Sequence, residues 1–216
     1  MTPKLDTWGI VLAGHWNRMI FTPEWVSANL FHQETIDTEI EIALLPVFPV
    51  IYRHPLVTLE ASGGRLVFRP RADNPKALEL AETMASTALR ELPNTPLMGV
   101  GINFSFTEQN PSPKLLELFN LADAGDIAHE GWEAPEIKLL RKLSGEHGTL
   151  HLTLGYDRDK VEIDINFHSE TTGTSHSANE AAKVAVSGRV LPLRAAALGF
   201  LDSVYHLKIE EGEVDG

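Results

Sequence analysis

The stretch from Leu97 to Phe106, LMGVGINFSF, constrains the fold more than any other part of the chain. Its side chains alternate between large apolar residues and residues that are small or polar, as in a β-strand that buries one face. The apolar set is Met98, Val100, Ile102, Phe104 and Phe106, and the other set is Gly99, Gly101, Asn103 and Ser105. Glycine weakens a strand interior, so two glycines on one face indicate that another group approaches the backbone closely there.

Trp8 to Trp16 is a similar stretch, and each of the two stretches is followed by a helix start. Thr22-Pro23 and Ser112-Pro113 both have the pattern of a helix N-cap followed by proline at the first helical position. The two prolines are 113 − 23 = 90 residues apart. We therefore predict an internal duplication within one integrated domain, with a first repeat over residues 1–94 and a second over 95–216.

The remaining patterns give both halves a similar order of elements. In the first half we predict a helix at 23–31, strands at 39–45, 50–52, 57–61 and 65–69, and a long helix at 76–92. In the second half we predict a helix at 114–121, a strand or short helix at 136–143, a hairpin of strands 149–156 and 160–168, and a helix at 190–208. Segment 169–189, small and polar, is predicted to be mobile, and the acidic tail 210–216 to be disordered.

The predicted fold class follows from this order. It is α+β, with two β-α-β(3-4)-α repeats that form one curved, mainly antiparallel sheet, and with the long helices packed on one face.

Charge and composition narrow the classes of function. The 216 residues include 30 acidic and 18 basic side chains, and the net charge of −12 works against contact with phosphates and anionic lipids. The chain has no cysteine, which excludes disulfides, thiolate zinc sites and a cysteine nucleophile. Its apolar runs are too short for a signal peptide or a membrane span, so we expect a cytoplasmic protein.

The order of elements resembles that of the TATA-box-binding protein family, in which two repeats form one curved antiparallel sheet. The resemblance implies that strands 8–16 and 97–106 lie near the middle of a concave face that binds DNA in the family, and that Asn103 is directed toward the ligand. The chain departs from the family in its charge. Strand 160–168 is expected to expose Glu162, Asp164, Asn166 and His168, and carboxylates on such a face repel phosphates. Duplex DNA is therefore not the expected partner.

The hairpin carries the most specific group of polar side chains. A turn at Arg158-Asp159 predicts the core pairs Leu152–Ile165 and Leu154–Ile163, and on the other face the pairs His151–Asn166, Thr153–Asp164 and Thr149–His168. Two histidines and a carboxylate on one face (His151, His168, Asp164) are suited to metal binding or acid–base chemistry. The alternative interpretation is a solvated strand face. No HExxH, Walker, GxSxG or GxGxxG motif is present, so we predict no catalytic residue, metal or cofactor.

Three functional hypotheses remain open. The leading one is a non-catalytic binding module, an adaptor or accessory subunit, that uses the small-residue face of the central sheet. A nucleic-acid-binding protein and a metal-dependent hydrolase are the alternatives. We expect a protein partner or a homodimer, and no membrane. The candidate binding residues are His15, Asn17, Gly99, Gly101, Asn103, Ser105, His151, Asn166 and His168.

Overall fold

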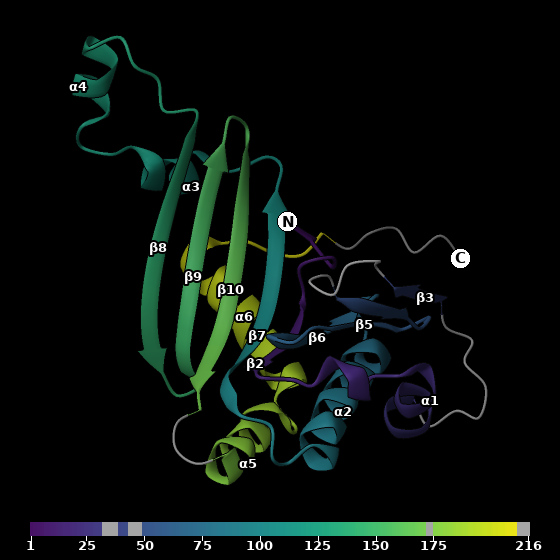
Figure 1. Ribbon diagram of the computed structural model, residues 1–216. Coiled ribbons are helices and arrows are strands. Elements are labelled where there is room, and N and C mark those ends of the chain that lie inside the picture. Colours follow the sequence, from purple (N-terminus) through teal and green to yellow (C-terminus); the bar gives the residue numbers. More distant parts are fainter. Residues whose placement is uncertain (32–38, 43–48, 172–174, 211–216) are drawn as a thin grey trace.

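The computed structural model describes residues 1–31, 39–42, 49–171 and 175–210, which form a ten-stranded sheet with helices packed against it (Figure 1). Nine strands lie side by side in the order β3-β4-β5-β6-β2-β7-β10-β9-β8, and β1 pairs with the end of β7. All pairings are antiparallel. The strands are β1 (Thr2–Pro3), β2 (Gly9–Gly14), β3 (Glu39–Ile42), β4 (Val50–Arg53), β5 (Val57–Ala61), β6 (Arg65–Pro70), β7 (Leu97–Glu108), β8 (Glu136–Gly145), β9 (Gly148–Asp157) and β10 (Lys160–Glu170). The predicted α+β class with a mainly antiparallel sheet is confirmed.

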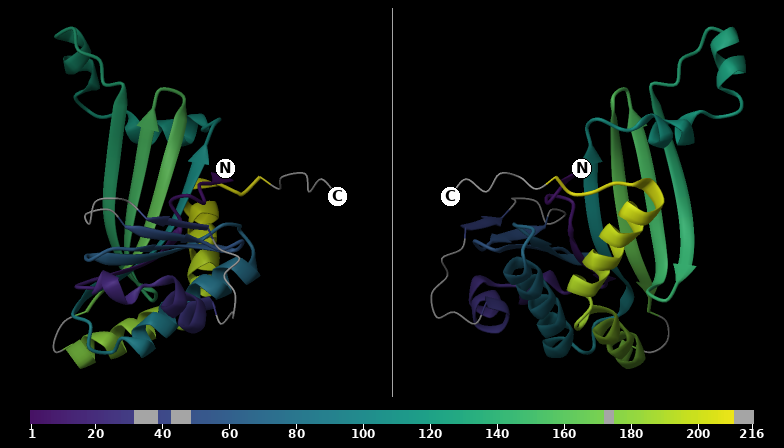
Figure 2. Two further views of the ribbon diagram at one scale, coloured as in Figure 1. Left: turned by 45° about the vertical axis from the view of Figure 1, so that its right-hand side comes forward. Right: turned by 180° about the vertical axis from the view of Figure 1, so that it is seen from behind.

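The long helices lie on one side of the sheet, as the rear view in Figure 2 shows. α2 (Pro75–Glu91) packs against β6 and β2, whereas α5 (Ser175–Val186) and α6 (Val190–Tyr205) pack against β7. α1 (Pro23–Val26) continues into the helical turn η2 (Ser27–Phe31), which contacts α2. In the described part of the chain, no helix covers the opposite side of the sheet. We call that side the helix-free face.

The connection between β7 and β8 starts against this body and then extends away from it. It begins with α3 (Pro113–Leu116) and the turn η3 (Glu117–Phe119), and then forms α4 (Ala124–His129), which stands apart from the sheet in Figure 1. Trp132, just after α4, is 72% exposed. The first part of the connection therefore belongs to the core, where Leu115 and Phe119 are buried, and its second part around α4 is an exposed arm.

The two predicted helix starts are confirmed at the level of individual hydrogen bonds. The Thr22 hydroxyl accepts the backbone N–H of Trp25 at 3.2 Å, and the Ser112 hydroxyl accepts that of Leu115 at 3.3 Å. In both helices proline occupies the first turn, where its missing N–H costs nothing. The short side-chain caps therefore determine where α1 and α3 begin.

The core lies between the helices and the inward side chains of the sheet. β7 buries Val100, Ile102, Phe104 and Phe106, as its alternation predicts. The fully buried Trp8 packs edge-on against two of these rings, at 5.1 Å from Phe104 and 5.5 Å from Phe106. Its indole N–H donates to the Ser105 carbonyl at 2.6 Å, so the buried polar atom is satisfied.

The prediction that Met98 lies on the buried face of this strand is wrong. Met98 is 56% exposed. The pairing of β7 with β2 shifts by one residue between Ala13 and Gly14, so that Gly14 lies opposite Leu97. Leu97 is only 7% exposed and takes the buried position at this end of the strand.

The hairpin of β9 and β10 has the predicted register, including the core pairs Leu152–Ile165 and Leu154–Ile163. Residues 136–143, predicted as a strand or a short helix, belong to the strand β8. β8 pairs with β9 along its whole length and forms one edge of the sheet.

The segment predicted to be mobile, 169–189, contains α5. Its buried residues include Ala178, Asn179, Ala182 and Val186. Residues 172–174, most of the predicted tail (211–216) and the end of the predicted strand at 39–45 lie outside the described residues. Within the described part, no single helix is long and apolar enough to cross a membrane, although α5 and α6 satisfy the length and composition criteria as a pair bent by 59°.

Candidate functional site

Four polar side chains meet at the middle of the helix-free face, and we call them the amide–imidazole cluster: Asn103, His151, Asn166 and His168. Asn166 lies between Asn103 of β7 and His151 of β9 in the strand register. Its Nδ2 donates to Oδ1 of Asn103 at 2.5 Å, and Nδ2 of Asn103 donates to the Gly9 carbonyl at 3.4 Å. The rings of His151 and His168 are stacked, with centroids 5.6 Å apart and planes 18° apart. Three neighbouring strands therefore contribute to one polar surface.

The glycines of β7 make room for this cluster. A Cβ atom added to Gly101 would lie 2.7 Å from Nδ2 of Asn166, much closer than real Cβ atoms approach a neighbour. A Cβ atom on Gly99 would lie 3.3 Å from Cε1 of His168. The close approach that the sequence indicates is thus made by side chains of β10, which lean over the bare backbone of β7.

The other candidate binding residues lie outside the cluster. Ser105 is on the same side of β7 but is buried, opposite Asp164. His15 follows β2, and its backbone N–H donates to the Pro96 carbonyl at 2.8 Å. Asn17 caps the turn η1 (Arg18–Ile20) by accepting the N–H of Met19 at 3.2 Å. Asn17 thus has a local structural role at the end of β2.

The residues proposed for metal chemistry are only partly brought together. His151 and His168 are stacked, but Asp164 lies opposite Thr153 and Ser105, four residues along β10 from His168. Among the described residues, no group of three or more His, Asp or Glu side chains is arranged to hold a metal ion.

Charges of both signs alternate on the helix-free face. Glu162 is 3.1 Å from Lys4 and 3.0 Å from Lys160, and hydrogen bonds from Lys160 and then Lys4 lower the pKa of its carboxyl. Across the sheet, Arg69 pairs with Glu60 at 2.9 Å. The basic groups of these pairs are thereby neutralised by carboxylates of the same face, which differs from the basic surface that phosphate recognition needs.

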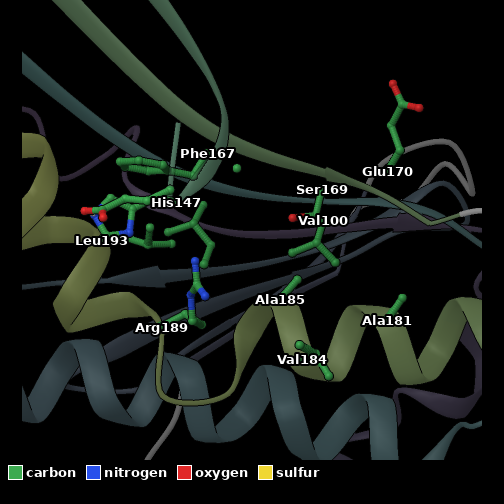
Figure 3. A pocket seen from close by; sticks show the side chains of 13 residues that line it. Val100, His147, Phe167, Ser169, Glu170, Ala181, Val184, Ala185, Arg189 and Leu193 are labelled. Atoms are coloured by element: carbon green, nitrogen blue, oxygen red, sulfur yellow. The ribbon is translucent and has the colours of Figure 1, made fainter. Parts of the chain in front are cut away.

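A pocket of about 300 Å³ lies on the other side of the sheet, between β7, β10 and the junction of α5 and α6 (Figure 3). Its lining is about equally polar and apolar, and the apolar part includes Val100, Ile102, Phe167, Ala181, Ala185 and Leu193. Arg189 enters it from the α5–α6 junction in Figure 3, and Glu146 and His147 of the β8–β9 turn also line it. The local sequence does not indicate this pocket, because α5, which supplies one wall, lies in the small and polar segment 169–189 that we predicted to be mobile.

Comparisons with known proteins assign no family. No family model matches the chain, and no curated protein matches it.

Proposed function

We propose that this chain is a non-catalytic binding module that docks a protein partner on the helix-free face of its sheet. The observation that carries the proposal is the amide–imidazole cluster at the centre of that face. Its amides and imidazoles offer hydrogen-bond donors and acceptors on a surface that no described helix covers. All four side chains are half-buried and are held by one another or by the backbone, so the surface is ordered before a partner arrives.

We also infer that the two halves of the chain are duplicated repeats related by an axis through this face. β2 and β7 pair with each other near the middle of the sheet. Their ladder has five regular pairs, and the middle pair joins Val11 to Gly101, which are 101 − 11 = 90 residues apart. The helix caps Thr22 and Ser112 are separated by the same number of residues. The strand order, the ladder and the caps thus support one common repeat, and we propose that its axis passes beside the cluster.

The charges on the face favour a protein over duplex DNA. Asp164 is exposed beside the cluster, and within the described residues it has no ion pair. The charge of Asp164 acts on Lys138 of β8, but no ion pair joins the two side chains, so this carboxylate can still repel a phosphate backbone and attract a lysine or arginine of a partner. We therefore propose a partner that presents a polar surface to the cluster and a basic side chain to Asp164.

Charge reversal on the two sides of the sheet tests the proposal. Asp164→Lys changes the helix-free face, and Glu79→Lys makes the same change at an exposed position of α2 on the helix side. Partners of the wild-type chain would be captured from its native cells, purified, and titrated against all three proteins. We expect Asp164→Lys to weaken binding by about tenfold or more, and Glu79→Lys to change it by less than about twofold.

A second measurement maps the contact directly. Hydrogen exchange of the complex should show protection in β7, β9 and β10, and Asn166→Ala should weaken the same complex. Equal binding by wild type and Asp164→Lys, or protection confined to the helices, would contradict the proposal. Tight, salt-sensitive binding to duplex DNA would instead support the nucleic-acid alternative.

A further inference from the structure

We propose that the pocket between the sheet and the α5–α6 junction is a separate binding site for a free monocarboxylic acid with an apolar body. The proposal does not depend on the protein-binding function of the helix-free face. It follows from three features of the pocket: apolar side chains on its floor, one cation that extends from a fixed backbone, and carboxylates that contact a histidine or point elsewhere.

The floor and walls suit a hydrocarbon or an aromatic ring. β7 and β10 contribute the apolar side chains of Val100, Ile102 and Phe167 to the floor, with the polar Ser169 beside Val100 in Figure 3. Ala181 and Ala185 form the wall on α5, and their small side chains leave the space open. The volume of about 300 Å³ lies at the lower end of the range of small-molecule sites.

Arg189 is the cation, and its backbone is fixed by α2. The carboxylate of Glu82 accepts three consecutive backbone N–H groups, those of Gly188 at 2.8 Å, Arg189 at 3.0 Å and Val190 at 2.9 Å. Gly188 has φ +70°, a conformation that glycine adopts readily, and this turns the chain from α5 into α6. The Arg189 side chain then points into the pocket, as Figure 3 shows. Among the described residues, its guanidinium has no hydrogen-bond or ion-pair partner.

The acidic groups near the pocket leave this cation available. Oε1 of Glu146 lies 3.2 Å from Nε2 of the neighbouring His147, so these two lining residues contact each other. Glu170 lines the pocket but directs its carboxylate away from it in Figure 3. An acid that lays its apolar body on the floor can therefore bring its carboxylate to Arg189, where the pairing is charge-assisted.

Binding of octanoate to the full-length protein, measured by titration calorimetry below its micelle concentration, tests the proposal. Octanol and octylammonium are matched probes that keep the chain and remove or reverse the charge. We expect both to bind about ten- to a hundredfold more weakly than octanoate. Arg189→Gln should weaken octanoate binding by a similar factor, whereas Arg90→Gln, a matched exposed arginine on α2, should leave it within about twofold.

Filling the pocket provides a second, independent variant. Ala185→Phe places a ring in the open space, and it should abolish octanoate binding while the protein keeps its far-UV spectrum. Failure of octanoate to bind, equal binding of octylammonium, or unchanged binding by Arg189→Gln would overturn the proposal. Asp164→Lys should leave octanoate binding intact, so that this site and the protein-docking face succeed or fail separately.

Discussion

The Glu82 carboxylate should be one of the most important single side chains for stability, because it caps a helix that has no cap of its own. At the start of α6, the side chain of Arg189 makes no capping hydrogen bond. Glu82 reaches across from α2 and accepts the three N–H groups at the junction. Glu82→Ala would leave these donors without their protein acceptor and would loosen the contact between α2 and α6.

The size of the effect can be worked out from these bonds. A hydrogen bond to a charged group contributes about 1.5–3 kcal/mol, and loss of a helix cap costs about 0.5–2 kcal/mol. Because the three bonds share one carboxylate, their energies do not add. We expect Glu82→Ala to lower the free energy of unfolding by about 2–3 kcal/mol, which corresponds to about 4–12 °C in Tm for a chain of this length. Glu82→Gln, which keeps one carbonyl oxygen as acceptor, should cost about half as much.

Urea unfolding followed by far-UV circular dichroism measures these differences through the midpoint and the slope. Glu79→Ala, at an exposed position of the same helix, is the matched control because it makes the same change in helix propensity and charge. If Glu82→Ala costs no more than Glu79→Ala, or less than about 0.5 kcal/mol, the reasoning about a cap supplied by α2 is refuted.

Two further predictions concern buried polar groups. Burial, and to a smaller extent the charge of Glu24, raises the pKa of Tyr52 from 10.0 to about 12. The stability that the neutral Tyr52 side chain contributes should therefore be complete below pH 10 and lost as the pH rises to about 12. Urea titrations across this range should show a smaller loss of stability for Tyr52→Phe than for wild type. Nδ2 of Asn179 donates to the carbonyl of Leu89 at 3.0 Å. This carbonyl would otherwise lack a donor, because the residue four positions later, Pro93, has no N–H. Asn179→Ala should therefore cost about 1–3 kcal/mol in the same unfolding assay, and a neutral result would contradict this role.

Sequence patterns predicted the elements whose causes are local. The caps Thr22 and Ser112 act within one helical turn, and the two-residue turn at Arg158-Asp159 determines the register of the hairpin through Leu152 and Ile165. The strand β7 was predicted equally well, because the side chains on one of its faces are large and apolar. Only at Met98 did the pairing with a distant strand override the local pattern.

The parts that were missed depend on contacts between distant segments. α5 buries small side chains such as Ala178 and Ala182, which give little apolar signal until α2 lies beside them. The pocket needs α5 in place, and Arg189 needs Glu82 from another helix, so neither could be predicted from local sequence. For β7, the sequence predicted a close approach to Gly101, but only the strand register identifies Asn166 as the approaching group.

The exposed arm after β7 has a spectroscopic consequence. Trp132 on this arm is 72% exposed, whereas Trp8 and Trp16 are at most 4% exposed in the core. Indole emission shifts to longer wavelength in water, so the native spectrum should contain a blue component from the core and a red component from the arm. Iodide should quench mainly the red component, and Trp132→Phe should remove it. The remaining emission would then come from Trp8 and Trp16 in the core and from the half-buried Trp25, which packs against Phe21, with no contribution from the arm.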